Sequence, residues 1–348
     1  MTIRVSLIII AIMYRKKTVF IAGAGCSKEF GLPLGPELRD QIYSECQDRS
    51  SAVRSAFRKS RLPGSDHEVD TKFSTFAAGL HTKQSIDQYL HFHRSDPTMV
   101  ALGKMAITYC ILSSERSSLL SRKHENLSLL GQTWLMKLFH GMNADTELET
   151  VANVFNNVSF ICFNYDRCIE VGFFRAIRML TNAPSEQIGE IIRSNLRIWH
   201  PYGTVGELSY DFIPNHSHLH GFPNEAVDYE DVLDGYQRLR TFTEGMDDEG
   251  KLSEMHRALL EAEQIVYLGF SFLDQNMELL TTPERKGSCP IYATLLGVSP
   301  PDVEQATVAM CYAAPVRQMP FTYRRENVRP LAAKAAEFMD HFGNTLRR

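Results

Sequence analysis

Short runs of apolar and β-branched residues alternate along the chain with longer stretches in which apolar residues recur at helical spacing. The short runs are typical of strands buried on both faces, because they lack the alternation of a half-exposed strand. Strands that alternate with helices predict a parallel sheet with helices on both faces, which is an α/β fold of the Rossmann-like kind. The runs that predict strands are Thr18–Ala22, Val158–Phe163, Leu196–Trp199, Ile265–Leu268 and Ile291–Leu296.

The long region between the first two predicted strands is mainly helical in pattern. Breaks are expected inside it at Pro63-Gly64 and Asp96-Pro97. We therefore expect a single domain over residues 1–348, with a Rossmann-like core at about 16–35 and 150–348 and a large helical insertion at about 36–149. Two later patterns predict a polar helical stretch over about 228–263 and a closing helix over 329–346.

The N-terminal stretch Val5–Met13 is apolar and follows Arg4, as in the apolar region of a signal peptide. It is too short to span a bilayer, and Tyr14, Arg15 and two lysines follow it in place of a cleavage site of small residues. We expect residues 1–12 to be a non-native or disordered extension, with Met13 as an alternative start. The expected protein is cytoplasmic and has no membrane partner.

Composition limits the classes of partner. The chain is 44% hydrophobic and 22% charged, as in ordinary globular proteins, and its net charge of -4 argues against direct nucleic-acid binding. Its seven cysteines form no Cys-x-x-Cys pair. Scattered, odd-numbered cysteines indicate reduced thiols, with neither a disulfide framework nor a zinc module.

Polar residues and glycines follow four of the predicted strands. Ligands of open parallel sheets bind beyond the carboxyl ends of the strands, so these residues are candidates for one site. A Gly-x-Gly turn between a strand and a helix also allows the backbone to approach a phosphate, although Lys28 stands where a full dinucleotide fingerprint has its third glycine. The four strand ends carry Gly23-Ala24-Gly25, Asn164-Tyr165-Asp166, His200 and Gly269-Phe270-Ser271.

Each of these residues also has a structural interpretation. Asn164 and Asp166 are favoured helix N-caps, His200 suits a half-buried strand end, and Gly269 suits a turn. The alternating histidines 216, 218 and 220 suggest a metal, but no nearby carboxylate or cysteine set completes such a site. We expect a solvated polar loop there and no metal.

The order of these motifs resembles the NAD-binding motifs of sirtuins, over about Thr18 to Leu280. The resemblance rests on Ala22-Gly23-Ala24-Gly25-Cys26-Ser27, Asn164-Tyr165-Asp166, His200-Pro201-Tyr202-Gly203 and Leu268-Gly269-Phe270-Ser271-Phe272, with Ser85–Leu90 and Thr241–Glu244 as further echoes. It is closest to the divergent bacterial branch, because the paired Cys-x-x-Cys zinc module of the classical deacylases is missing.

The resemblance implies an NAD hydrolase that cleaves the nicotinamide–ribose bond to nicotinamide and ADP-ribose, as a regulated effector of antiphage defence. NAD is then the substrate. Asn164 would hold the ribose or a water, Asp166 would orient ribose or carboxamide groups, and His200 would be the general base. The residues implied to contact the dinucleotide are Ala22, Gly23, Ala24, Gly25, Ser27, Gly269 and Ser271.

Several alternatives stay open. His220, followed by Gly221, is a rival base because it keeps a literal His-Gly pair. A non-catalytic NAD or ADP-ribose sensor is a second function, and an NAD-dependent deacylase or ADP-ribosyltransferase is a third. Hydrolysis and cyclisation of ADP-ribose are not distinguished. A homo-oligomer is expected on general grounds, and the resemblance implies a separately encoded ATPase or sensor partner.

Overall fold

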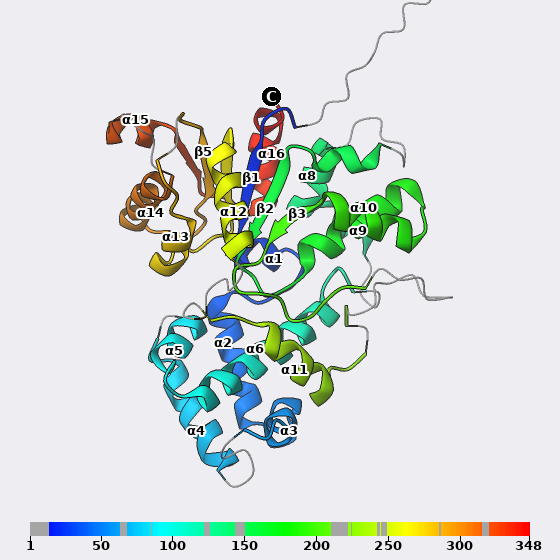
Figure 1. Cartoon of the computed structure of the whole chain (residues 1–348), viewed down its shortest axis with the longest axis vertical. Coiled ribbons are helices and arrows are strands. Elements are labelled where there is room, and N and C mark those ends of the chain that lie inside the picture. The colour runs from blue at the N-terminus through cyan, green and yellow to red at the C-terminus, as the bar shows by residue number, and fades with distance from the viewer. Residues whose placement is uncertain are drawn as a thin grey trace, which may run out of the picture.

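The protein is described from a computed structural model, in which a central parallel sheet lies between layers of helices (Figure 1). It describes residues 14–62, 68–83, 85–121, 126–142, 150–209, 222–223, 225–241, 244, 249–284, 287–314 and 320–348. The predicted extension over 1–12 lies outside these residues. Within them, no helix is both long and apolar enough to cross a membrane.

The sheet has six strands in the order β3-β2-β1-β4-β5-β6, and every neighbouring pair is parallel. This is the strand order of dinucleotide-binding Rossmann folds, so the predicted fold class is confirmed. The order reverses direction between β1 and β4, and the crevice beyond these two strands is where such sheets bind ligands. The strands are β1 (Thr18–Ala22), β2 (Val158–Cys162), β3 (Arg197–Trp199), β4 (Gln264–Leu268), β5 (Ile291–Thr294) and β6 (Val328–Leu331).

Helices cover both faces of the sheet, as predicted. Alternate strand residues enter two separate cores: Val19 and Ile21 of β1 face one core, whereas Phe20 and Ala22 face the other. In the second core the Phe20 ring stacks on that of Phe160 in β2 at 5.5 Å. Burial on both faces explains why the central strands are continuous apolar runs in the sequence.

The two cores contain different helices. The first core contains α2 (Gly35–Gln47), α3 (Ala52–Lys59), α4 (Val69–Leu80), α5 (Ile86–Phe92), α6 (Pro97–Ser117), α11 (Tyr229–Gly235), α12 (Glu249–Glu261), α13 (Asp274–Leu280) and α14 (Pro300–Ala313). The second contains α8 (Trp134–Met142), η2 (Val151–Phe155), α9 (Cys168–Thr181), α10 (Ser185–Asn195) and α16 (Ala335–Leu346). The short elements α1 (Ala24–Lys28), α7 (Leu127–Gly131), η3 (Tyr236–Arg238) and α15 (Phe321–Glu326) complete the described chain.

The helices α2 to α6 form a lobe at one end of the molecule (Figure 1). Asp96 accepts hydrogen bonds from the backbone N–H groups of Thr98 and Met99 and so begins α6, which confirms the break predicted at Asp96-Pro97. The break at Pro63-Gly64 lies outside the described residues. The last helix of the predicted insertion, α8, packs instead with α9 and α16 in the second core of the sheet.

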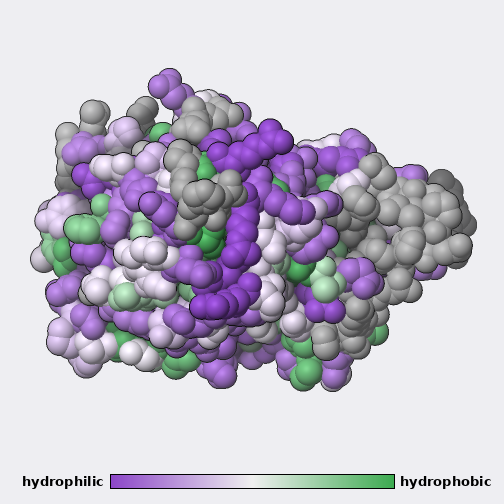
Figure 2. Space-filling model, turned by 90° about the horizontal axis from the view of Figure 1, so that it is seen from below, coloured by the Kyte–Doolittle hydropathy of each residue, from purple (hydrophilic) through white to green (hydrophobic). Residues whose placement is uncertain are grey.

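Seen from the lobe's end, the visible surface is mostly hydrophilic, with hydrophobic residues scattered in small groups (Figure 2). Isolated hydrophobic residues on a surface need no binding partner to explain them. Among the described residues visible in this view, no broad apolar area is present.

The predicted closing helix exists, but its predicted start is wrong. The stretch 329–346 begins with the edge strand β6, and the helix α16 starts only at Ala335. Pro330 is tolerated in β6 because an edge strand has one unpaired side. The described part of the stretch 228–263 is largely helical, as predicted, and its helices are α11, η3 and α12.

Three glycines allow the turns after β1 and β4 to touch through their backbones. Gly25 donates its N–H to the carbonyl of Gly269 at 2.9 Å. A Cβ on Gly25 would lie 2.6 Å from the Cα of Gly269, and one on Gly23 would lie 2.5 Å from the Gly269 carbonyl oxygen. Gly269 also has a φ of 56°, in the left-handed region that favours glycine.

We expect Gly269→Ala to destabilise the fold strongly. The left-handed backbone alone costs about 1–2 kcal/mol for a residue with a Cβ. That Cβ would also lie 2.3 Å from the backbone nitrogen of Cys26, so the strands would have to shift. Chemical denaturation measures the loss. Gly35→Ala is the control because a Cβ there meets no atom within 4 Å, and equal stability losses in the two variants would contradict the interpretation.

Candidate active site

The site lies where β1, β2 and β3 end, and four of the predicted residues meet there. Asn164 follows β2 and donates from its side-chain nitrogen to the Gly23 carbonyl at 2.9 Å and to the Ser27 hydroxyl at 2.8 Å. The amide therefore ties the end of β2 to the turn after β1. No described residue donates a hydrogen bond to the Asn164 Oδ1, which leaves this atom available to a ligand.

Asp166 is buried behind Asn164. Its Oδ1 accepts the backbone N–H of Cys168, the first residue of α9, at 3.0 Å, but the N-cap residue of that helix is Arg167 and not Asp166. Burial raises the pKa of Asp166, and hydrogen bonds from Ser27 and Cys168 oppose that rise. The carboxyl is 4% exposed, so in this arrangement it holds the loop and does not face solvent.

His200 follows β3, and both of its ring nitrogens face acceptors. Nδ1 lies 3.2 Å from the backbone carbonyl of Asn164, and Nε2 lies 3.1 Å from the Glu170 Oε1. Burial alone would lower the pKa of His200, but the Cys162 sulfur and the Glu170 carboxylate raise it above the ordinary value. Two oxygen acceptors at the two ring nitrogens favour the doubly protonated ring, and such a ring has to lose a proton before it can act as a base.

Of the other predicted ligand contacts, Ser27 and the Gly25 amide are already used in hydrogen bonds within the protein, and Ser271 is exposed. Ser27 is 3% exposed and is committed to Asn164 and Asp166. The Gly25 N–H is already donated to Gly269, so this amide is not available to a phosphate. Ser271 is exposed and makes no hydrogen bond within the described chain. Its neighbour Phe272 has a φ of 54°, a strained backbone of the kind that gathers at functional sites.

The helical lobe holds the loop that carries these residues. The Tyr165 hydroxyl donates to the Asp87 carboxylate of α5, and the guanidinium of Arg167 pairs with Glu115 of α6. The Arg167 and Glu115 side chains are only 2% and 0% exposed. Burial raises the pKa of Glu115, and the Arg167 charge opposes this rise. Residues on both sides of Asp166 are therefore fixed to the lobe.

The sequence reasoning missed Glu115 and Glu170. Glu170 could have been found from the sequence, because it is an acidic residue in the first turn of the helix that follows Asn164-Tyr165-Asp166. Glu115 could not have been found in this way, because it lies 52 positions from its partner Arg167 in an otherwise ordinary helix. The candidate metal histidines 216, 218 and 220, and with them the rival base His220, lie outside the described residues. The described residues contain no group of three or more His, Cys, Asp or Glu side chains suited to a metal ion.

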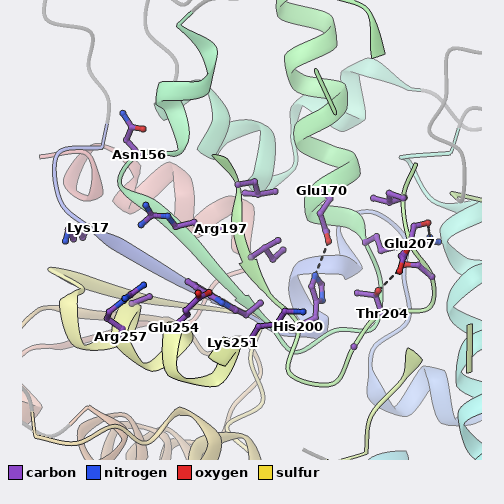
Figure 3. Close-up of a pocket in the computed structure, with 18 of the residues that line it drawn as sticks. Lys17, Asn156, Glu170, Arg197, His200, Thr204, Glu207, Lys251, Glu254 and Arg257 are labelled. Carbon is purple, nitrogen blue, oxygen red and sulfur yellow. Dashed lines mark hydrogen bonds and ion pairs between the residues drawn. The ribbon is translucent and has the colours of Figure 1, made fainter. Parts of the chain in front are cut away.

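A cavity of about 1100 Å³ runs along the outer edge of β3 and reaches His200 and Glu170 (Figure 3). Charged residues surround it, among them Arg197 of β3 and Lys251, Glu254 and Arg257 of α12. Gly23, Asn164 and Ser271 do not line it. His200 thus lines this cavity and also contacts Asn164, which is bound to the Gly23 turn.

Comparisons with known proteins give limited information. No protein-family model matches the sequence, and no curated protein matches it. Among solved structures, one match is a Sir2 homologue in complex with NAD, with TM-score 0.38, 12% identity, and coverage of 97% of this chain and 91% of the other. Another is a Sir2 variant with a deacetylated p53 peptide and 3′-O-acetyl-ADP-ribose, with TM-score 0.36, 13% identity, and coverage of 96% and 95%.

A third match, from work on the mechanism and regulation of Sir2 enzymes, has TM-score 0.38, 11% identity, and coverage of 97% and 94%. At these TM-scores we draw no functional conclusion from the matches. We infer the function of the site from the residues of this chain.

We expect Glu115→Gln to destabilise the protein by about 3–5 kcal/mol, because it leaves the Arg167 charge buried without a counter-charge. Denaturant unfolding followed by circular dichroism measures this loss. Glu304→Gln is the matched control, since Glu304 pairs with Arg325 at the surface, where ion pairs contribute little. A loss no larger than that of the control would contradict the structural role of the buried pair.

Proposed function

We propose that the protein is an NAD hydrolase that cleaves the bond between nicotinamide and ribose to give nicotinamide and ADP-ribose. The observation that carries the proposal is the convergence of Asn164, Asp166 and His200 beside the Gly23 turn, at the carboxyl ends of three adjacent parallel strands. A dinucleotide crossing the switch point between β1 and β4 would bring its nicotinamide ribose toward these residues.

The chemistry of NAD suits such a site. When the C1′–N bond breaks, its electron pair leaves with nicotinamide, whose ring nitrogen becomes neutral, and positive charge develops on the ribose. A water oxygen then bonds to C1′ and releases one proton. The enzyme therefore has to position the ribose, favour the developing cation and take that proton, and it needs no acid for the leaving group.

The side chains divide these tasks. The free Asn164 Oδ1 would accept a ribose hydroxyl or orient the water, and the buried Asp166 would keep the loop in place and favour positive charge. His200 would take the proton from water once it is neutral, a task suited to an imidazole. The turns at Gly23, Ala24 and Gly269 would lie along the dinucleotide. Regulated NAD depletion in antiphage defence, as the sirtuin-like motifs imply, is part of this proposal.

One observation favours a second candidate, an NAD or ADP-ribose sensor without turnover. Both nitrogens of His200 face acceptors within the protein, so neither is free for a substrate in this arrangement. A sensor would keep the ring in that state when NAD binds. A hydrolase would have to release one nitrogen from its partner.

Nicotinamide release from NAD, followed by chromatography, tests the proposal. We expect turnover by the wild type, and a fall of about 10²-fold or more in His200→Ala, because a general base contributes at least that much. Asn164→Ala is expected to abolish turnover as well, with unchanged circular dichroism in both variants. His341→Ala is the control, since His341 is an exposed histidine far along the chain in α16.

Three results would redirect the assignment. Tight NAD binding with no nicotinamide release under any condition would favour the sensor. Release only with an acylated peptide would favour a deacylase. Wild-type release by His200→Ala together with its loss in His220→Ala would move the base to His220.

A further inference from the structure

Glu170 is the closest charged partner of His200, and nothing in the sequence motifs assigns it a role. It lies in the first turn of α9, and its Oε1 is 3.1 Å from the His200 Nε2 (Figure 3). The two side chains are only 14% and 11% exposed, so the contact is shielded from water. Shielding makes such an interaction much stronger than at a surface.

The Glu170 carboxylate has little else to bind. Its second oxygen, Oε2, is buried and has no hydrogen-bond partner within the described chain. A buried carboxylate oxygen without a hydrogen-bond donor costs free energy, so a favourable interaction elsewhere on the carboxylate has to offset that cost. The interaction between the Glu170 Oε1 and the imidazole of His200 is the one that the geometry provides.

The groups around the ring determine its charge. Asp166 in the loop and Glu170 on α9 are the carboxyls near it, and the Cys162 thiol of β2 also faces it. Arg167, which follows Asp166 in the loop, is committed to Glu115. On the cavity side, Lys251 and Glu254 of α12 carry opposite charges.

We infer that Glu170 is the positioning residue for His200: it orients the imidazole through Nε2 and sets the pH at which the ring becomes the neutral base. This inference rests on the proposed function, because it gives His200 the task of accepting a proton. Glu170 acts through His200 and has no contact of its own with the reacting atoms.

The inference has a defined consequence for pH. Burial acts against the charged ring, but the Cys162 sulfur and the Glu170 carboxylate hold the pKa of His200 above its ordinary value. A base works only when it is neutral, so turnover should rise with pH as His200 loses its proton. Removing the Glu170 charge lowers the pKa of His200, and the acidic limb of the pH profile should then move to lower pH.

Glu170→Gln tests this, because the amide keeps the size and an oxygen acceptor but removes the charge. Two measurements are made on the full-length protein: nicotinamide release as a function of pH, and the titration of the His200 ring by ¹⁵N NMR. His200→Ala identifies the His200 signal among the 12 histidines. We expect both the ring titration and the acidic limb to shift to lower pH in Glu170→Gln.

Two further variants control the experiment. Glu170→Asp keeps the carboxylate and should leave the His200 titration nearer to the wild type than Glu170→Gln does. Glu190→Gln removes a surface charge that pairs with Arg193 on α10 and should move neither profile.

An unchanged His200 titration in Glu170→Gln would overturn the inference, whatever happens to turnover. If Glu170→Gln fails to fold, Cys162→Ser decides, because it removes the other group that raises the pKa of His200. A His200 that then titrates at or below the ordinary histidine range overturns the inference, and one that still titrates above that range supports it. The NMR titration does not need NAD turnover. A failure of the proposed hydrolase function, seen as no nicotinamide release, is therefore separate from a failure of the role of Glu170.

Discussion

The direct backbone contact between the turn after β1 and the turn after β4 is the constraint on which the rest of the site depends. Gly25 and Gly269 approach so closely that neither position has room for a Cβ, and the hydrogen bond between them joins the two halves of the sheet at its switch point. Asn164 then reaches across to the Gly23 carbonyl from β2. The glycines therefore serve the protein's own packing, because they allow the two turns to meet through their backbones.

The helical lobe is part of the site because it holds the loop after β2. Tyr165 is bound to Asp87, Arg167 is bound to Glu115, and Asp166 lies between them. Buried polar contacts of this kind add little net stability, but they are costly to break, so they favour one arrangement of the loop. A change in the lobe's position would therefore reach Asn164 and Asp166 through these two contacts.

Much of the fold could be predicted from local pattern. The five predicted strands exist because strands buried on both faces require continuous apolar runs. The sixth strand, β6, was not predicted because it contains Pro330, and proline argues against a strand except at the edge of a sheet. For the candidate site, the strand ends predicted Asn164, Asp166 and His200 as neighbours, since parallel strands end at one edge. The partner Glu115 was not predictable, because pairing across 52 positions is decided by how the lobe folds back.

The sequence by itself determined the class of fold and the residue types at the strand ends, because periodicity and glycine turns act over a few residues. Only the tertiary structure decided what those residues do to one another. In the folded chain, the Ser27 hydroxyl and the Gly25 N–H form internal hydrogen bonds. Glu170 contacts His200 where both side chains are shielded from water. Burial and the distance between charges fix whether an imidazole is a free base or a paired cation, and both are properties of the folded chain.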